Sequence, residues 1–106
     1  MRGLGVWIFA VGLVWACAPS LPSVQEADVQ RVEALRPGAT RAGLAEGRRL
    51  YAQRCGSCHR LPDPGAHALE EWPSLVEWMR IRSHLDTAEG RQVTDWILSR
   101  RLVAGP

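Results

Sequence analysis

The sequence predicts a small all-α protein built from three to four short helices. Three segments repeat apolar residues every three or four positions, which is the spacing of one helix face, and no segment alternates apolar and polar residues as a half-buried strand does. Pro37-Gly38 and the run from Pro62 to Gly65 interrupt the chain outside these segments. With 106 residues, the chain is long enough for one small domain.

The first residues are typical of an export signal. Arg2 precedes an apolar run from Leu4 to Ala16. This run is shorter than the roughly 20 apolar residues that a membrane-spanning helix needs, and it matches the apolar region of a secretory signal. We therefore expect residues 1–16 to be a signal peptide and the mature protein to be exported.

Cys17 follows this run directly. The stretch Val14-Trp15-Ala16-Cys17 resembles the bacterial lipobox, although Trp15 departs from the usual small or aliphatic residue. Cleavage after Ala18 also fits the rule of small residues around a signal-peptide cut, but Pro19 would then follow the cut, where proline is poorly accepted. The sequence therefore favours a lipid on Cys17 that anchors the protein to a membrane on the periplasmic side.

Residues 17–39 are expected to form a tether, partly helical or disordered, ahead of a domain over residues 40–106. Proline, serine, glutamine and charged residues dominate the composition of this tether. Within it, Ser23-Val24-Gln25-Glu26 has the capping-box pattern, and a rough apolar stripe predicts a short helix up to Leu35 as the alternative to disorder.

The domain is expected to contain three helices. The first covers residues 41–53 after Thr40 as a possible N-cap, the second ends near Arg82, and the third covers residues 87–101. A proline-bearing loop separates the first two helices. The apolar face of the second helix carries residues at positions i, i+3, i+4 and i+7, namely Trp72, Leu75, Val76 and Met79.

A CGSCH motif from Cys55 to His59 directly follows the first helix. A disulfide between Cys55 and Cys58 would close a very small loop and add little stability. A structural zinc site needs four ligands, and the chain has no second cysteine pair. A thioredoxin-type motif expects strands in a βαβ setting and does not require His59.

Haem attachment accounts for all three functional groups of this motif. Cys55 and Cys58 lie within one helical turn, so each thiol can bond to one vinyl group of the same haem, while His59 reaches the iron as an axial ligand. About sixty residues in three short helices are also close to the size below which a core needs external support. We therefore expect one covalently bound haem c, which would complete the core.

The domain resembles the class I monohaem c-type cytochromes, and within them a group of small exported bacterial proteins with a CHxLPDP loop and a distal methionine. The resemblance covers residues 40 to about 102. It is carried by Gly47 and Tyr51 in the first helix, by the CGSCH motif, by the stretch CHRLPDP and by Trp96 in the last helix.

This resemblance implies a cytochrome c-like fold in which Gly47 and Tyr51 pack against Trp96. It also implies that a backbone carbonyl of Pro62 or Pro64 holds the proximal imidazole. The residues expected to pack around the haem are Gly47, Tyr51, Pro62, Trp72, Leu75 and Trp96.

The sixth iron ligand is expected to be Met79. On the helix pattern alone Met79 is a core residue, since it shares the apolar face of the second helix. If a haem is bound, this apolar face has to cover the porphyrin. The resemblance then implies that the thioether of Met79 ligates the iron. His67 and His84 are the alternative ligands, and an open sixth position is a further alternative.

The resemblance implies an electron-transfer protein rather than an enzyme. A pair of axial ligands formed by His59 and Met79 raises the reduction potential and closes the iron to small molecules, which suits a carrier of single electrons between redox partner proteins. The alternatives are a haem-based sensor with a labile sixth ligand and a haem subunit of a larger oxidoreductase complex. A net charge of +2 without a basic cluster gives no indication of a nucleic-acid partner.

Overall fold

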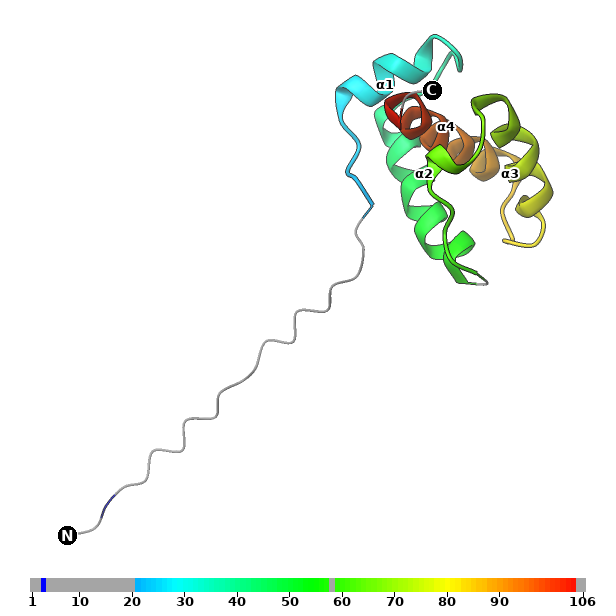
Figure 1. Ribbon diagram of the computed structural model, residues 1–106. Coiled ribbons are helices and arrows are strands. Elements are labelled where there is room, and N and C mark those ends of the chain that lie inside the picture. Colours follow the sequence, from blue (N-terminus) through cyan, green and yellow to red (C-terminus); the bar gives the residue numbers. More distant parts are fainter. Residues whose placement is uncertain (1–2, 4–20, 58, 105–106) are drawn as a thin grey trace.

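The structure is a computed structural model that describes residue 3 and residues 21–57 and 59–104. Within these ranges the chain forms four α-helices and three short 3₁₀ turns and contains no β-strand (Figure 1). The prediction of an all-α protein is therefore confirmed for the described part of the chain. The helices are α1 (Glu26–Glu33), α2 (Arg41–Arg54), α3 (Trp72–Arg80) and α4 (Thr87–Ala104), and the 3₁₀ turns are Cys55–Ser57, Pro64–Ala66 and Leu69–Glu71.

The three helices predicted for the domain lie close to their expected positions. Thr40 is the N-cap of α2, because its Oγ1 accepts a hydrogen bond of 3.0 Å from the Gly43 amide. α2 and α4 extend by one and three residues beyond their predicted ends. α3 instead ends at Arg80, two residues before the predicted Arg82, and His84 then adopts a left-handed conformation with a φ of 56° in the turn that leads to α4.

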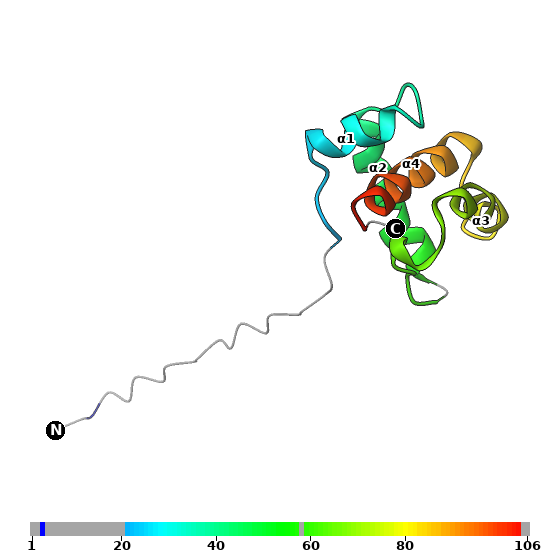
Figure 2. The same ribbon diagram turned by 45° about the horizontal axis from the view of Figure 1, so that its top comes forward.

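The centre of the fold is the crossing of α2 and α4 (Figure 2). Gly47 lies where the two helices come closest. A Cβ atom on Gly47 would be 2.0 Å from the carbonyl oxygen of Gln92 and 2.5 Å from its carbonyl carbon. Because no side chain separates the two backbones here, both helices can bury the residues that flank the crossing, namely Leu44, Leu50, Val93 and Trp96.

α3 packs against α4 on the side away from α1. Its buried residues are Trp72 and Val76, and Leu85 in the following turn is buried with them. The Arg80 side chain passes over Gly90 of α4 and donates a hydrogen bond of 3.1 Å to the Leu85 carbonyl. Apolar packing and this arginine therefore hold α3 against α4.

α1 also packs against α4, which differs from the expectation that the folded unit begins near residue 40. Val32 is completely buried and Val29 is nearly so. The helix ends at Glu33 rather than at Leu35. Residues that were expected to form a tether therefore include a helix that belongs to the folded unit.

Ion pairs between the α1 region and α4 explain why this helix is docked. Asp28 is only 2% exposed, and its Oδ1 accepts hydrogen bonds from Arg31 of the same helix and, at 3.2 Å, from Arg100 of α4. Arg36, which follows α1, donates a hydrogen bond of 2.7 Å to Asp95 of α4. In the first pair the α1 region supplies the aspartate and α4 the arginine. In the second pair the α1 region supplies the arginine and α4 the aspartate.

Replacing Asp28 with alanine is expected to lower the free energy of unfolding by about 1–3 kcal/mol, because its hydrogen-bond partners lose a buried acceptor. The measurement is chemical denaturation of the purified variant. Glu26→Ala, at an exposed position of the same helix, is the matched control and is expected to change stability little. Equal stability of both variants and the wild type would show that the ion pairs of Asp28 do not stabilise the docking of α1.

The predictions for the N-terminus fall on residues that the structure, Gly3 apart, does not describe. These are the signal peptide over residues 1–16 and the lipid on Cys17. Among the described residues, no helix is both long and apolar enough to span a membrane.

Candidate functional site

The motif that the sequence singles out lies at the end of α2. Cys55 is the C-cap of α2 and the first residue of the 3₁₀ turn Cys55–Ser57. Cys58 lies outside the described residues, and His59 is exposed just beyond it. The helical register of α2 continues into the turn, so Cys55 stays on the side of the helix that Tyr51 faces, one turn earlier.

A cavity of about 200 Å³ lies beside this motif. Its wall comes from the end of α2, the loop after the motif, α3 with its following turn, and α4. The wall is almost entirely apolar. Most of the predicted site residues line this cavity, namely Tyr51, Cys55, His59, Pro62, Trp72, Leu75 and Met79.

The predicted contact between α2 and α4 is present behind this cavity. The ring centroids of Tyr51 and Trp96 are 5.2 Å apart with an angle of 38° between the ring planes. Gly47, one turn before Tyr51, touches the α4 backbone directly. The expected contact of Tyr51 with Trp96 is therefore present, whereas Gly47 meets the backbone of Gln92 and Val93 rather than Trp96. Tyr51 also lines the cavity.

The loop after the motif is fixed by side chains from three helices. The Tyr51 hydroxyl of α2 donates to the Pro62 carbonyl, and Trp72 Nε1 of α3 donates to the Pro64 carbonyl at 2.8 Å. Burial holds the pKa of Tyr51 above its usual range, so this hydroxyl remains a donor. Arg101 Nε of α4 donates to the His67 carbonyl at 2.8 Å.

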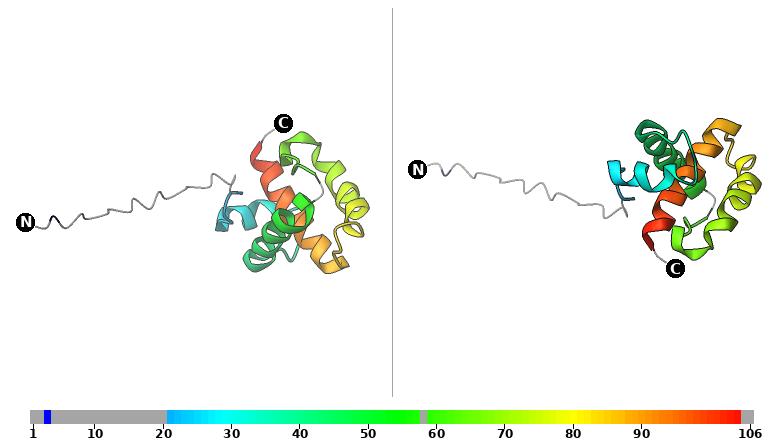
Figure 3. Two further views of the ribbon diagram at one scale, coloured as in Figure 1. Left: turned by 90° about the horizontal axis from the view of Figure 1, so that it is seen from below. Right: turned by 90° about the horizontal axis from the view of Figure 1, so that it is seen from above.

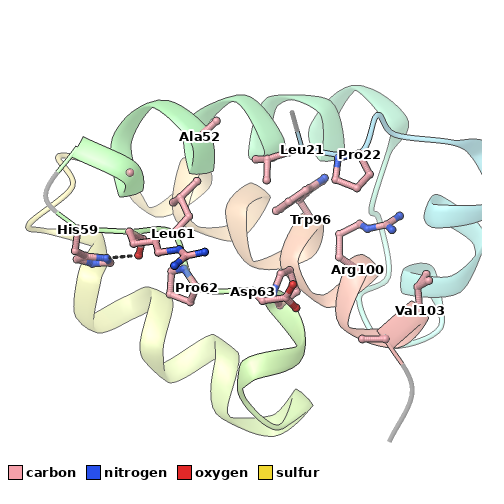
Figure 4. Close-up of a pocket in the computed structure, with 14 residues that line it drawn as sticks. Leu21, Pro22, Ala52, His59, Leu61, Pro62, Asp63, Trp96, Arg100 and Val103 are labelled. Carbon is pink, nitrogen blue, oxygen red and sulfur yellow. Dashed lines mark hydrogen bonds between the residues drawn. The ribbon is translucent and has the colours of Figure 1, made fainter. Parts of the chain in front are cut away.

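The imidazole of His59 has a different backbone partner from the one expected. Its Nδ1 lies 2.9 Å from the carbonyl oxygen of Arg60 (dashed line in Figure 4). The Pro62 and Pro64 carbonyls instead accept hydrogen bonds from Tyr51 and Trp72. The expectation that Pro62 or Pro64 holds the ring is therefore replaced by a contact with the next residue. A proton on Nδ1, shared with this carbonyl, leaves the lone pair of Nε2 for a metal ion.

Cys55 is half-buried and lies in a setting that favours the protonated thiol. Burial raises the pKa of the Cys55 thiol, and a hydrogen bond with Ser83 offsets only part of this shift. Reactive cysteines of thiol oxidoreductases have lowered thiol pKa values instead. The surroundings of Cys55 thus argue against the interpretation of the motif as a thioredoxin-type redox site.

The three residues considered as sixth ligand differ in position. Met79 is half-buried on α3 and lines the small cavity. His67 lines it as well, but its Nδ1 lies 3.6 Å from Glu71 Oε2 and its ring meets the Trp72 ring edge-on at 5.1 Å. His84 is exposed in the turn between α3 and α4. Met79 and His67 thus both lie on the small cavity, whereas His84 does not line it.

A second, larger cavity of about 900 Å³ lies between α2, α4 and the loop after the motif (Figure 4). His59 and Pro62 line both cavities, whereas Cys55 and Met79 line only the smaller one. The larger cavity also has charged side chains in its wall, those of Arg60, Asp63 and Arg100. The smaller cavity is therefore the more apolar of the two, and it is the one that Cys55 and Met79 share.

Seven residues that the sequence did not single out as site residues also line the small cavity. They are Val76, Trp78 and Arg80 on α3, Ser83 and Leu85 in the turn after α3, and Val93 and Ile97 on α4. The spacing of Val93 and Ile97, four residues apart on one helix face, was the available signal. No pattern marks Ser83, because its contact with Cys55 depends on the path of the turn.

The described residues contain no cluster of three or more His, Cys, Asp or Glu side chains that could hold a metal ion without another group. Compared with protein-family models, with curated proteins and with solved structures, the chain gives no match. The assignment of function therefore depends on the motif and on the cavity beside it.

Proposed function

We propose that this protein is an exported monohaem c-type cytochrome that carries single electrons between redox partners. The observation that carries the proposal is the convergence of Cys55, His59 and Met79 on one apolar cavity. These residues come from the end of α2, the following loop and α3, and they supply a thiol, an imidazole and a thioether. Together with Cys58 they form the donor set of a covalently attached haem with two axial ligands.

The side chains present supply the donor atoms that a covalently attached haem needs, and the cavity wall is apolar, as the haem ring requires. The volume of the cavity lies below the roughly 300–1,000 Å³ of typical ligand pockets, so binding requires the wall to move apart. The exposed segment around His59 is the part of the wall that can move with the smallest loss of packing. The haem would supply one-electron chemistry at its iron.

Each residue of the site has a distinct task in this proposal. The thiols of Cys55 and Cys58 hold the group covalently, and Nε2 of His59 is the proximal nitrogen ligand. Met79 offers a thioether from the apolar face of α3, and Trp72 and Leu75 exclude water around it. A thioether ligand and a dry surrounding both favour a high reduction potential.

An anchored location completes the proposal. Cys17 carries the lipid, and Leu21, four residues later, already packs against the core. The protein would then stay at the periplasmic face of a membrane. Its partners are other redox proteins or an oxidoreductase complex.

Met79→Leu tests the identity of the sixth ligand. We expect the oxidised wild type to show the charge-transfer band of a sulfur–iron bond and the reduced wild type to resist carbon monoxide. The variant, which keeps the apolar volume but has no sulfur, should lose the band and bind carbon monoxide. The measurement is an absorption spectrum of both redox states.

His67→Gln is the matched control for the other histidine on the cavity, and its spectrum should equal that of the wild type. Loss of the native spectrum in His67→Gln but not in Met79→Leu would assign the sixth position to His67. Rapid carbon monoxide binding by the wild type itself would favour a sensor over an electron carrier.

A further inference from the structure

The outer face of α3 and the turn after it carry an exposed apolar patch beside the cavity. Trp78 and Ile81 are 63% and 72% exposed, among the most exposed large apolar residues of the described chain. The Arg82 guanidinium lies 4.0 Å from the centroid of the Trp78 ring and donates a hydrogen bond to the Trp78 carbonyl at 3.1 Å. We call Trp78, Ile81 and Arg82 the α3 patch.

The charge of the α3 patch is positive. Glu77, the nearest acidic residue in α3, is paired with Arg80 through two hydrogen bonds of 2.9 and 3.0 Å. Among the described residues, no carboxylate lies within ion-pair distance of Arg82. Asp86, further along, accepts a hydrogen bond from the Glu89 amide and is compensated by the N-terminus of α4.

A second guanidinium lies at the same end of the domain. Arg54, at the end of α2, places Nη1 3.3 Å from the carbonyl oxygen of His84 in the turn after α3. The α3 patch thus combines an aromatic anchor, an aliphatic residue and one cationic group. Trp and Arg are the residue types that most often dominate binding energy at protein interfaces.

Trp78 connects this patch to the cavity. It lines the cavity together with Met79, its neighbour in sequence, while most of its side chain is exposed. A partner bound to the α3 patch would therefore contact a side chain that also lines the cavity.

The described N-terminal segment leaves the α3 patch open. α1 and residues 21–25 lie on the side of α4 opposite to α3 (Figure 3). The proposed lipid on Cys17 is four residues before Leu21, a span of at most about 14 Å. An anchor on the α1 side would turn the α3 patch away from the membrane, toward soluble partners.

We propose that the α3 patch is the docking surface for an acidic region of a soluble redox protein. This inference rests on the proposed function, because it names the partner of the same haem site. The aromatic ring and Ile81 meet the apolar centre of the partner surface, and Arg82 meets its carboxylates. Rim charges of this kind act mainly on the association rate and on its dependence on salt.

The test is voltammetry of the mature holoprotein on a gold electrode coated with a mixed monolayer that ends in carboxylate and methyl groups. We expect Arg82→Gln to lower the electroactive coverage about fivefold at low ionic strength, and much less at high ionic strength. Ile81→Ser should lower it at both ionic strengths. Trp78 is left intact because it lines the cavity.

Arg41→Gln is the matched control, since Arg41 is exposed at the start of α2 and the change removes the same charge. Equal losses in Arg41→Gln and Arg82→Gln, or no loss in either patch variant, would overturn the docking proposal. A dimer in sedimentation that Ile81→Ser dissociates would assign the patch to a second copy of this chain and overturn it as well. Solution spectra taken beforehand separate this failure from failure of the proposed function, which would appear as missing haem.

Discussion

Replacing Gly47 with alanine is expected to lower the free energy of unfolding by about 2–3 kcal/mol. The added Cβ would be 2.0 Å from the Gln92 carbonyl oxygen and 3.0 Å from the Val93 nitrogen. These are backbone atoms of a packed helix, so the relief must come from moving α2 away from α4. Each kcal/mol corresponds to about 4–8 °C in melting temperature for a domain of this size, which thermal unfolding followed by circular dichroism resolves.

Gly90→Ala is the matched control for this substitution. Gly90 is also buried in α4, but its nearest neighbour is the Cδ atom of Arg80, at 2.7 Å from the added Cβ. A flexible arginine can move, and alanine favours a helix over glycine by roughly 0.5–1 kcal/mol. We therefore expect a small change of either sign. Losses of equal size at the two positions would contradict the close crossing of α2 and α4.

Replacing Cys55 with alanine is expected to remove most of the covalently bound haem from the purified protein. One of the two thioether bonds can no longer form, and the group loses its attachment at the end of α2. The measurement is haem absorbance per chain after unfolding the protein.

Cys17→Ala is the control for a general effect of losing a cysteine. It should leave the haem content per chain unchanged and shift the protein from the membrane fraction to the soluble fraction. Full haem content in Cys55→Ala would remove Cys55 from the site. An unchanged membrane fraction in Cys17→Ala would contradict the proposed lipid on Cys17.

Local patterns in the sequence predict most of the helical structure and part of the site. The Thr40 cap and the periodic faces of α2, α3 and α4 depend on residues a few positions apart, so periodicity is sufficient to find them. The contact of Tyr51 with Trp96 was expected from the resemblance to c-type cytochromes, since no local rule relates positions so far apart.

Contacts between distant positions account for what the sequence did not predict. The docking of α1 depends on Asp28 meeting Arg100, which is 72 positions away. The carbonyls of Pro62 and Pro64 are taken by Tyr51 and Trp72, a choice that follows from how α2 and α3 converge on the loop. A solvated helix and a docked one share the same spacing of apolar residues, so the pattern alone could not separate them.

The most direct test of the account is whether the unfolded wild-type chain retains haem. The mature protein is unfolded in denaturant and passed through a sizing column, while absorbance is followed at the haem and protein wavelengths. The account predicts that haem and polypeptide elute together, because Cys55 and Cys58 hold the group through covalent bonds. Haem that elutes separately, or a purified chain with no haem, would contradict it.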